Sequence, residues 1–279
     1  MPDLQSVSFS TAGWRLAQDD GTMRAWENAV GDTLSLHVFL KVPDLAGPLS
    51  GIDRIRDGYR TAVVQVGGGL VEVEADELGG LPALRTIFRF PQDPHGVSYI
   101  GAWTIPRRSF SFVIKVCCAE HGTTGIREAA FGVRQLQFAQ NEDGPSEGWF
   151  RDPHDPGFRA PVLRNSSDDM EWDEVFPQHP LSRARACLRS VKESISIGED
   201  VRRSEPFVGP QAKDCPRCGL VNPPGAQRCD CGYDFGKRRM ARSYLQPNRW
   251  QRPWVWIGGV FLTLAIIRLV VRLLNELSK

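Results

Sequence analysis

The sequence lacks the common signatures of a catalytic centre and of secretion. It has no HExxH, GxSxG or paired-carboxylate pattern, and the three glycines at 67–69 are not followed by the residues of a phosphate-binding loop. They predict a hairpin turn. The N-terminal stretch "MPDLQSVSFSTAGWRL" has neither the basic nor the apolar region of a secretory signal. We therefore expect a non-enzymatic protein in a reducing cytoplasm, where disulfides are disfavoured.

Cysteine is scarce, and four of the seven cysteines lie close together in the sequence: Cys215, Cys218, Cys229 and Cys231. A redox CxxC motif requires a βαβ context that the sequence lacks, and it would leave the second pair unexplained. Four thiolates, in contrast, complete a tetrahedral Zn²⁺ shell with no open position, which makes such a zinc site structural. We expect Gly219 to adopt a positive φ, so that backbone N–H groups point at sulfur.

The stretch "CPRCGLVNPPGAQRCDCGYDF" (residues 215–235) resembles the Ran-binding-protein type of zinc finger and, more broadly, short zinc ribbons appended to bacterial membrane proteins. RNA-binding members carry a Trp two residues before the first cysteine, where this chain has Lys213. Ubiquitin-binding members carry Thr-Phe after the second, where it has Gly219 and Leu220. The resemblance therefore implies a small folding module that presents a loop to a protein partner. Arg217 and Arg228 lack a stacking aromatic residue, which makes nucleic acid a less favoured partner.

Residues 1–197 predict one α+β domain with a mainly antiparallel sheet. In "TLSLHVFLKV" (33–42), apolar residues alternate with polar ones, as in a half-buried strand. Similar short runs, separated by Gly, Pro or Asp turns, follow at 61–66, 70–75, 84–90, 97–105 and 109–118. This order faintly resembles PsbP-like domains, a likeness that implies an accessory or binding module.

Two main helices are predicted in this domain. The first covers 124–139, with Ile126, Ala130 and Val133 expected on its buried stripe. The second covers 181–195, and its apolar residues recur at helical spacing: Leu181, Ala184, Leu188, Val191 and Ile195. Its basic residues are expected on a solvated face: Arg183, Arg185, Arg189 and Lys192.

The remaining segments before the C-terminus read as connections. Residues 141–180 are rich in Pro, Asp and Gly and predict a long loop with a solvated acidic part: Asp168, Asp169, Glu171, Asp173 and Glu174. Residues 198–213 are expected to be a linker to the zinc ribbon at 214–236, which a basic segment at 237–253 follows.

The apolar run from Trp254 to Leu274 predicts a transmembrane helix, because 21 residues span about 31 Å. Its thirteen Val, Ile, Leu and Phe residues favour insertion by about 4–8 kcal/mol. Arg268 opposes insertion by at most about 3 kcal/mol, and less if its side chain snorkels. Spanning is therefore favoured over the alternative, an interfacial helix.

Charge is distributed unevenly along the chain. From Lys237 onward there are nine Lys or Arg residues and one acidic residue, against 25 basic and 32 acidic residues before it. Basic residues before the run hold the N-terminal side in the cytoplasm. We therefore expect a bacterial, tail-anchored, single-pass protein on the cytoplasmic face of the inner membrane, with lipid contacts through the run and its basic flank.

These features favour a membrane-anchored binding or scaffold protein with structural Zn²⁺ and a protein partner. One alternative is an enzyme whose site lies near Cys117, Cys118 and His121. Adjacent cysteines on a strand point to opposite faces, however, which favours ordinary core or edge thiols. A second alternative is a nucleic-acid binder that uses the ribbon and the basic segment, and whose binding would depend strongly on salt.

Overall fold

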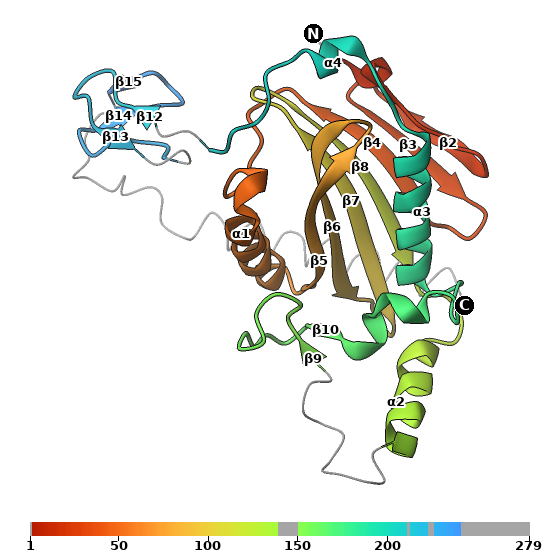
Figure 1. Cartoon of the computed structure of the whole chain (residues 1–279). Helices are drawn as coiled ribbons and strands as arrows, with labels where there is room; N and C mark the ends of the chain where they lie inside the picture. Colours follow the sequence, from red (N-terminus) through yellow and green to blue (C-terminus); the bar gives the residue numbers. More distant parts are fainter. Residues whose placement is uncertain (1, 139–149, 211–212, 223–225, 241–279) are drawn as a thin grey trace, which may run out of the picture. The chain divides into compact units, whose positions relative to one another are not determined.

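The computed structural model describes residues 2–138, 150–210, 213–222 and 226–240 (Figure 1). The chain divides into two compact units, Met1–Pro210 and Gln211–Lys279. The predicted span at 254–274 lies outside the described residues. In the part of the chain that is described, no helix is long and apolar enough to cross a membrane.

The first unit is built on a seven-stranded antiparallel sheet with the order β2-β3-β4-β8-β7-β6-β5. The strands are β2 (Trp14–Asp19), β3 (Met23–Asn28), β4 (Thr33–Phe39), β5 (Gly69–Leu78), β6 (Leu81–Pro91), β7 (Val97–Pro106) and β8 (Ser111–Ala119). The mixed α+β class and the antiparallel sheet are confirmed. The hairpin β2-β3 was not predicted, because its strands lack the apolar alternation of the central ones: β2 is exposed along nearly its whole length.

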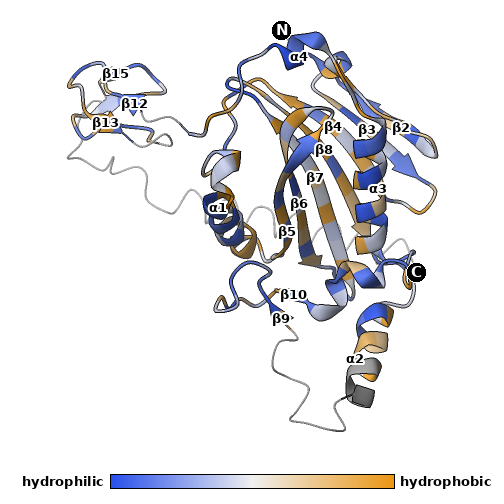
Figure 2. Ribbon diagram, viewed as in Figure 1, coloured by the Kyte–Doolittle hydropathy of each residue, from blue (hydrophilic) through white to orange (hydrophobic). Residues whose placement is uncertain are grey.

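Helix α3 (Pro180–Ser194) lies across one face of the sheet, over β7 and β8 (Figure 1). Its predicted apolar stripe is buried, with Leu181, Ala184, Leu188 and Val191 each at most 1% exposed. Gly101 permits this close approach, since a Cβ at that position would lie 2.9 Å from Leu188 Cδ1. Apolar and polar residues alternate along α3 and the central strands, and the apolar ones belong to the core between them (Figure 2).

Helix α1 (Ile52–Gln65) packs on the opposite face, against β5. Alternate residues of β6 belong to the two cores, because Ala83 and Ile87 pack with α3 whereas Leu84 packs with α1. The sequence interpretation missed this helix, and the strand predicted at 61–66 is wrong. Val63 is buried as part of the helical face, and the glycines at 67–69 connect a helix to a strand instead of two strands.

Helix α2 (Ile126–Phe138) confirms the predicted element but not its buried face. Ile126 and Val133 are more than half exposed, whereas Arg127 and Phe131 are buried. The fold therefore has three helices of thirteen residues or more among the described residues, where two main ones were predicted. The stripe was misjudged because the helix packs on the segment at 166–173 through a charged residue and a ring.

Short elements complete the first unit. They are β1 (Val7–Ser8), which pairs with β11 (Ser196–Ile197), β9 (Phe150–Arg151), which pairs with β10 (Arg164–Asn165), and α4 (Glu199–Arg202). Three-residue 3-10 helices occur at Leu4–Ser6, Leu49–Gly51, Ser166–Asp168 and Met170–Trp172. Part of the expected linker thus belongs to this unit, since α4 lies within it and Arg107 forms a bridge to Pro206.

The described part of the second unit consists of two small hairpins. Strand β12 (Lys213–Asp214) pairs with β13 (Val221–Asn222), and β14 (Tyr233–Asp234) pairs with β15 (Arg239–Met240). Cys215 and Cys218 lie in the turn between β12 and β13. Cys229 and Cys231 precede β14, in a turn closed by the bridge between Arg228 and Asp234.

Candidate metal centre and buried ionic network

The four clustered cysteines meet at one point of the second unit. Their sulfur atoms all lie within 4.8 Å of one another. The Sγ atoms of Cys215 and Cys231 are 3.6 Å apart, as are those of Cys218 and Cys229. Sulfurs about 2.3 Å from a tetrahedral Zn²⁺ are about 3.8 Å apart, so the four thiols are placed to bind a metal ion such as zinc.

Backbone N–H groups point at the sulfur atoms of these cysteines. Gly219 has φ +71°, as predicted, and its N–H donates to Cys215 O in a tight turn. Burial opposes ionisation of Cys215, but backbone N–H groups of Cys218 and Arg217 that point at its sulfur lower its pKa to about 7. The Leu220 N–H acts in the same direction on Cys218, but burial and the neighbouring thiols raise the pKa of Cys218 to about 12, and burial and Cys215 raise that of Cys231. The buried Asn222 side chain lies 3.5 Å from Cys229 Sγ and donates to Leu220 O. These donors support sulfur ligands without occupying the metal position.

The outer surface of the second unit is partly apolar. Leu220, Val221 and Met240 are each more than a third exposed. Of Arg217 and Arg228, only Arg228 forms an ion pair among the described residues, with Asp234 at 3.4 Å. Three apolar side chains of this unit are therefore accessible from outside.

The alternative site at Cys117, Cys118 and His121 is not assembled. Cys118 faces the core, is 1% exposed and has a pKa raised well above its usual range by burial and then by Asp32. Cys117 is on the opposite face of β8, as predicted from the strand alternation. His121 is exposed on the loop that follows. Of the described residues, these three do not belong to any cluster placed to hold a metal.

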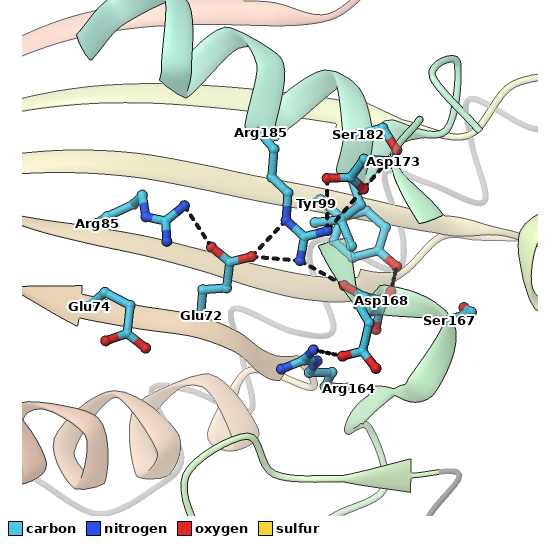
Figure 3. A network of polar contacts seen from close by, with 12 residues as sticks. Glu72, Glu74, Arg85, Tyr99, Arg164, Ser167, Asp168, Asp173, Ser182 and Arg185 are labelled. Carbon is cyan, nitrogen blue, oxygen red and sulfur yellow. Dashed lines mark hydrogen bonds and ion pairs between the residues drawn. The ribbon is translucent and has the colours of Figure 1, made fainter. Parts of the chain in front are cut away.

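The first unit contains a buried ionic network that the sequence interpretation missed. Its centre is Arg185, only 3% exposed, which donates to Glu72 at 2.7 Å, to Asp173 at 3.0 Å and to the backbone oxygen of Asp168 at 2.7 Å (Figure 3). A solvated basic face was expected for this part of α3. Arg185 is buried because the segment at 166–173 folds over the end of the helix and supplies the acceptors.

Asp168 anchors the same network from the side of the loop. Its side chain is fully buried and accepts a hydrogen bond of 2.6 Å from Tyr99 and one of 3.1 Å from Arg89. Burial, together with this carboxylate, raises the pKa of Tyr99 well above its usual range. The prediction of a solvated acidic loop is therefore wrong for Asp168, and also for Asp173, which pairs with two buried arginines.

Arg127 closes the network from α2. It is fully buried and donates to Asp173 and to Ser182, as well as to the backbone oxygens of Ser167 and Asp169. Every contact joins elements far apart in the sequence. The network thus holds the 166–173 segment between α2, α3 and the sheet. Its arginines stabilise the fold through these contacts.

His179 is the N-cap of α3 and lies beside this network. Its Nδ1 accepts from the Leu181 N–H at 3.3 Å and lies 3.4 Å from a nitrogen of Arg127. Burial, with the nearby positive charge of Arg127, lowers the pKa of His179 to about 3. The imidazole is therefore neutral at pH 7.

Comparisons with known proteins leave the family open. No family model matches the chain, and no curated protein matches it. Among solved structures it is similar to the Ran-binding protein Mog1p of Saccharomyces cerevisiae, with a TM-score of 0.38, 9% identity, and coverage of 70% of this chain and 93% of that one. It is also similar to the cyanobacterial PsbP protein CyanoP of Synechocystis, with a TM-score of 0.29, 13% identity, and coverage of 48% and 86%.

A third similar structure is a Bacteroides thetaiotaomicron protein, with a TM-score of 0.26 and 10% identity, where the match covers 42% of this chain and 39% of that chain. A PsbP-like structure is therefore among the neighbours. All three likenesses are too weak to support an argument about function.

Proposed function

We propose that the chain is a binding or scaffold protein in which a structural Zn²⁺ ribbon presents an apolar surface to a protein partner at a membrane. The observation that carries the proposal is the closed cysteine shell: four sulfurs at tetrahedral spacing would leave a bound ion no position for substrate. The ribbon then acts through its surface, where Leu220, Val221 and Met240 are exposed.

Partner binding is tested by affinity purification of the full chain from solubilised membranes, with Val221→Asp as the variant. Val221 is 63% exposed, so a buried interface around it should lose at least about tenfold in partner recovery. Val208→Asp is the matched control, since Val208 is 61% exposed in the first unit. A zinc-loaded Val221→Asp protein that recovers every wild-type partner would contradict the proposed surface.

The membrane part of the proposal rests on the sequence of residues 254–274. Leu264→Arg would place a second charge in the span at a cost of roughly 3 kcal/mol, and should move much of the protein to the soluble fraction. The wild type should resist carbonate extraction, and its first unit should be digested only in inverted vesicles. Release of the wild type by carbonate or high salt would indicate an interfacial helix instead.

The two alternatives have their own tests. An enzyme that uses the Cys118 thiol would lose turnover in a substrate screen on Cys118→Ala, a result that the deep burial of this thiol makes unexpected. A nucleic-acid binder would weaken steeply between about 50 and 200 mM salt. An affinity that stays flat over this range dismisses the second alternative.

A further inference from the structure

Three side chains that can bind a metal converge beside the N-terminus of α3. Glu120 follows β8, Glu128 lies in the first turn of α2, and His179 is the N-cap of α3. Their ligand atoms all lie within 4.8 Å of one another. The three residues come from three separate elements, so only the folded chain assembles this group.

Two of the three side chains have a buried atom without a hydrogen-bond partner. Among the described residues, Glu128 Oε2 and His179 Nε2 are both in this position. Glu120 and His179 are each only 8% exposed as residues. Buried polar atoms are normally paired, so an unpaired nitrogen and an unpaired carboxylate oxygen in one such group call for an occupant.

The charges of the group also favour a cation. Glu128 pairs with Arg89 at 3.2 Å, but the same guanidinium also pairs with Asp168. Glu120 accepts backbone N–H groups from Val97 at 3.0 Å and Gly125 at 2.9 Å, and enters no ion pair of the described chain. Positive charge is also near, since four arginines act on His179: Arg127, Arg89, Arg183 and Arg185. Each of these arginines is already paired with a carboxylate outside the group, so the charges of Glu120 and Glu128 remain to compensate a divalent cation.

We propose that Glu120, Glu128 and His179 form a second metal site, which takes a divalent ion such as Mn²⁺. Two carboxylates and one imidazole are the ligands such ions accept, and three protein ligands leave coordination positions open. A cavity of about 410 Å³ adjoins the site and is lined by Glu120 and His179 together with apolar residues such as Val30 and Phe176. It provides room for water or a small ligand at the open positions.

The arginines that line the cavity are paired with carboxylates other than Glu120 and Glu128. Arg127 and Arg183 also line the cavity, but their guanidinium groups are held by Asp173 and Asp32. Metal binding through Nε2 requires the remaining ring proton on Nδ1. The site therefore gives up the hydrogen bond from Leu181 N–H at 3.3 Å and the contact of Nδ1 with the Arg127 nitrogen at 3.4 Å, both near or beyond the long end of the normal range. The Arg127 nitrogen keeps its hydrogen bonds to Asp173 and Ser182.

The test is a Mn²⁺ titration of the full chain whose ribbon already holds zinc. Mn²⁺ ranks below zinc for thiolate ligands, so it should leave the ribbon unchanged. Free Mn²⁺, measured by electron paramagnetic resonance, should show one ion bound per chain. Cys229→Ser should bind the same amount of Mn²⁺, because the ribbon cysteines do not contribute to this site.

Three variants locate the site. Glu120→Gln, Glu128→Gln and His179→Asn should each weaken Mn²⁺ binding by more than about tenfold. Asparagine is a good N-cap, so the last variant removes the nitrogen ligand while it preserves the helix cap. Glu199→Gln, at an exposed position of α4, is the matched control and should bind as the wild type.

Urea unfolding midpoints show whether each variant is still folded. No Mn²⁺ bound to the wild type at millimolar concentration would overturn the proposal. So would a folded Glu120→Gln protein with wild-type affinity. Loss of binding in all three folded variants, with no loss in the control, supports it.

Discussion

The two units of this chain are stabilised in different ways. The first unit has a sheet with a helix on each face, fully buried apolar side chains such as Leu188 and Ile87, and a buried ionic network around Arg185. In the described part of the second unit, the deeply buried apolar side chains are Cys215 and Cys229. The cysteines proposed to bind zinc therefore occupy the place of a hydrophobic core, which predicts opposite responses to the same perturbations.

Metal removal should give the largest difference in stability between the two units. Structural zinc contributes about 10–16 kcal/mol to the folding of comparable small modules. Cys229→Ser, or a chelator, should therefore unfold the ribbon while the thermal transition of the first unit stays unchanged. Amide hydrogen exchange followed by mass spectrometry measures both units in one sample.

Cys117→Ser is the control for this experiment, because Cys117 lies outside the ribbon and is only half-buried. Less than about 0.2 metal ions per freshly reduced chain would contradict the zinc assignment. Joint unfolding of both units on metal removal would contradict their independence.

Loss of Arg185 should have the next largest effect, and only in the first unit. Arg185→Met leaves Glu72 and Asp173 buried with fewer partners, which costs about 3–5 kcal/mol in comparable cases. Arg85 remains 3.1 Å from Glu72, so we expect the low end of this range. Urea unfolding measures the change.

Arg189→Met is the matched control, since this arginine is exposed on the same helix. It should change the free energy of unfolding by less than about 0.5 kcal/mol. Equal effects of the two variants would mean that the buried network contributes no more than a surface charge.

Acid should weaken the first unit through Asp32. Burial opposes the charge of this carboxylate, but hydrogen bonds from Arg183 at 2.8 and 2.9 Å outweigh it and lower its pKa. A carboxylate whose pKa is lowered in the folded state contributes its full stabilisation above the unfolded-state pKa of about 3.9. This contribution is lost as the pH falls from that value through the lower pKa of the folded state. Asp32→Asn should therefore cost about 2 kcal/mol at pH 7 and clearly less near pH 3.

Unfolding by urea at several pH values measures this difference. Asp53→Asn is the control, because the Asp53 side chain is 88% exposed. A cost of Asp32→Asn that stays constant from pH 7 to pH 3 would show that the charge of Asp32 does not stabilise the fold.

The smallest effect is expected at the ion pair of the ribbon. Arg228 is half exposed where it contacts Asp234, and such pairs contribute less than about 1 kcal/mol. Arg228→Gln should therefore change zinc affinity by less than about fivefold in a competition assay with a chelator. A larger loss would mean that the ribbon depends on charge pairing as the first unit does.

Secondary structure was predicted correctly where one apolar face of an element determines how it packs. The alternation at 33–42 marked β4, although the strand ends at Phe39, and Leu40 and Val42, expected on its buried face, are exposed. The 3,4 spacing at 181–195 marked α3, because this helix packs a single apolar side on the sheet. The pattern misled at 61–66, where a short run of β-branched residues belongs to α1. A short run of this kind is compatible with both the helical and the strand period. The surface against which the segment packs decides which of the two it forms.

The charged residues show the limit more clearly. Arg185, Arg127 and Asp168 looked like solvated groups in the sequence, yet all three are buried. Their burial depends on partners at least 12 residues away, such as Asp173 for both Arg185 and Arg127 and Glu72 for Arg185. No local spacing signals a pair of this kind.

The sequence alone determined the cysteine cluster and the apolar face of α3, because each depends on spacing within one short segment. It also indicated the alternating central strands of the antiparallel sheet, but not the exposed hairpin β2-β3. Only the tertiary structure decided which charges are buried, and it alone brought Glu120 and Glu128 to His179. Burial of a charge is favourable only when a partner from elsewhere in the chain arrives to compensate it. That compensation is a property of the folded chain, and it is what makes the second metal site visible.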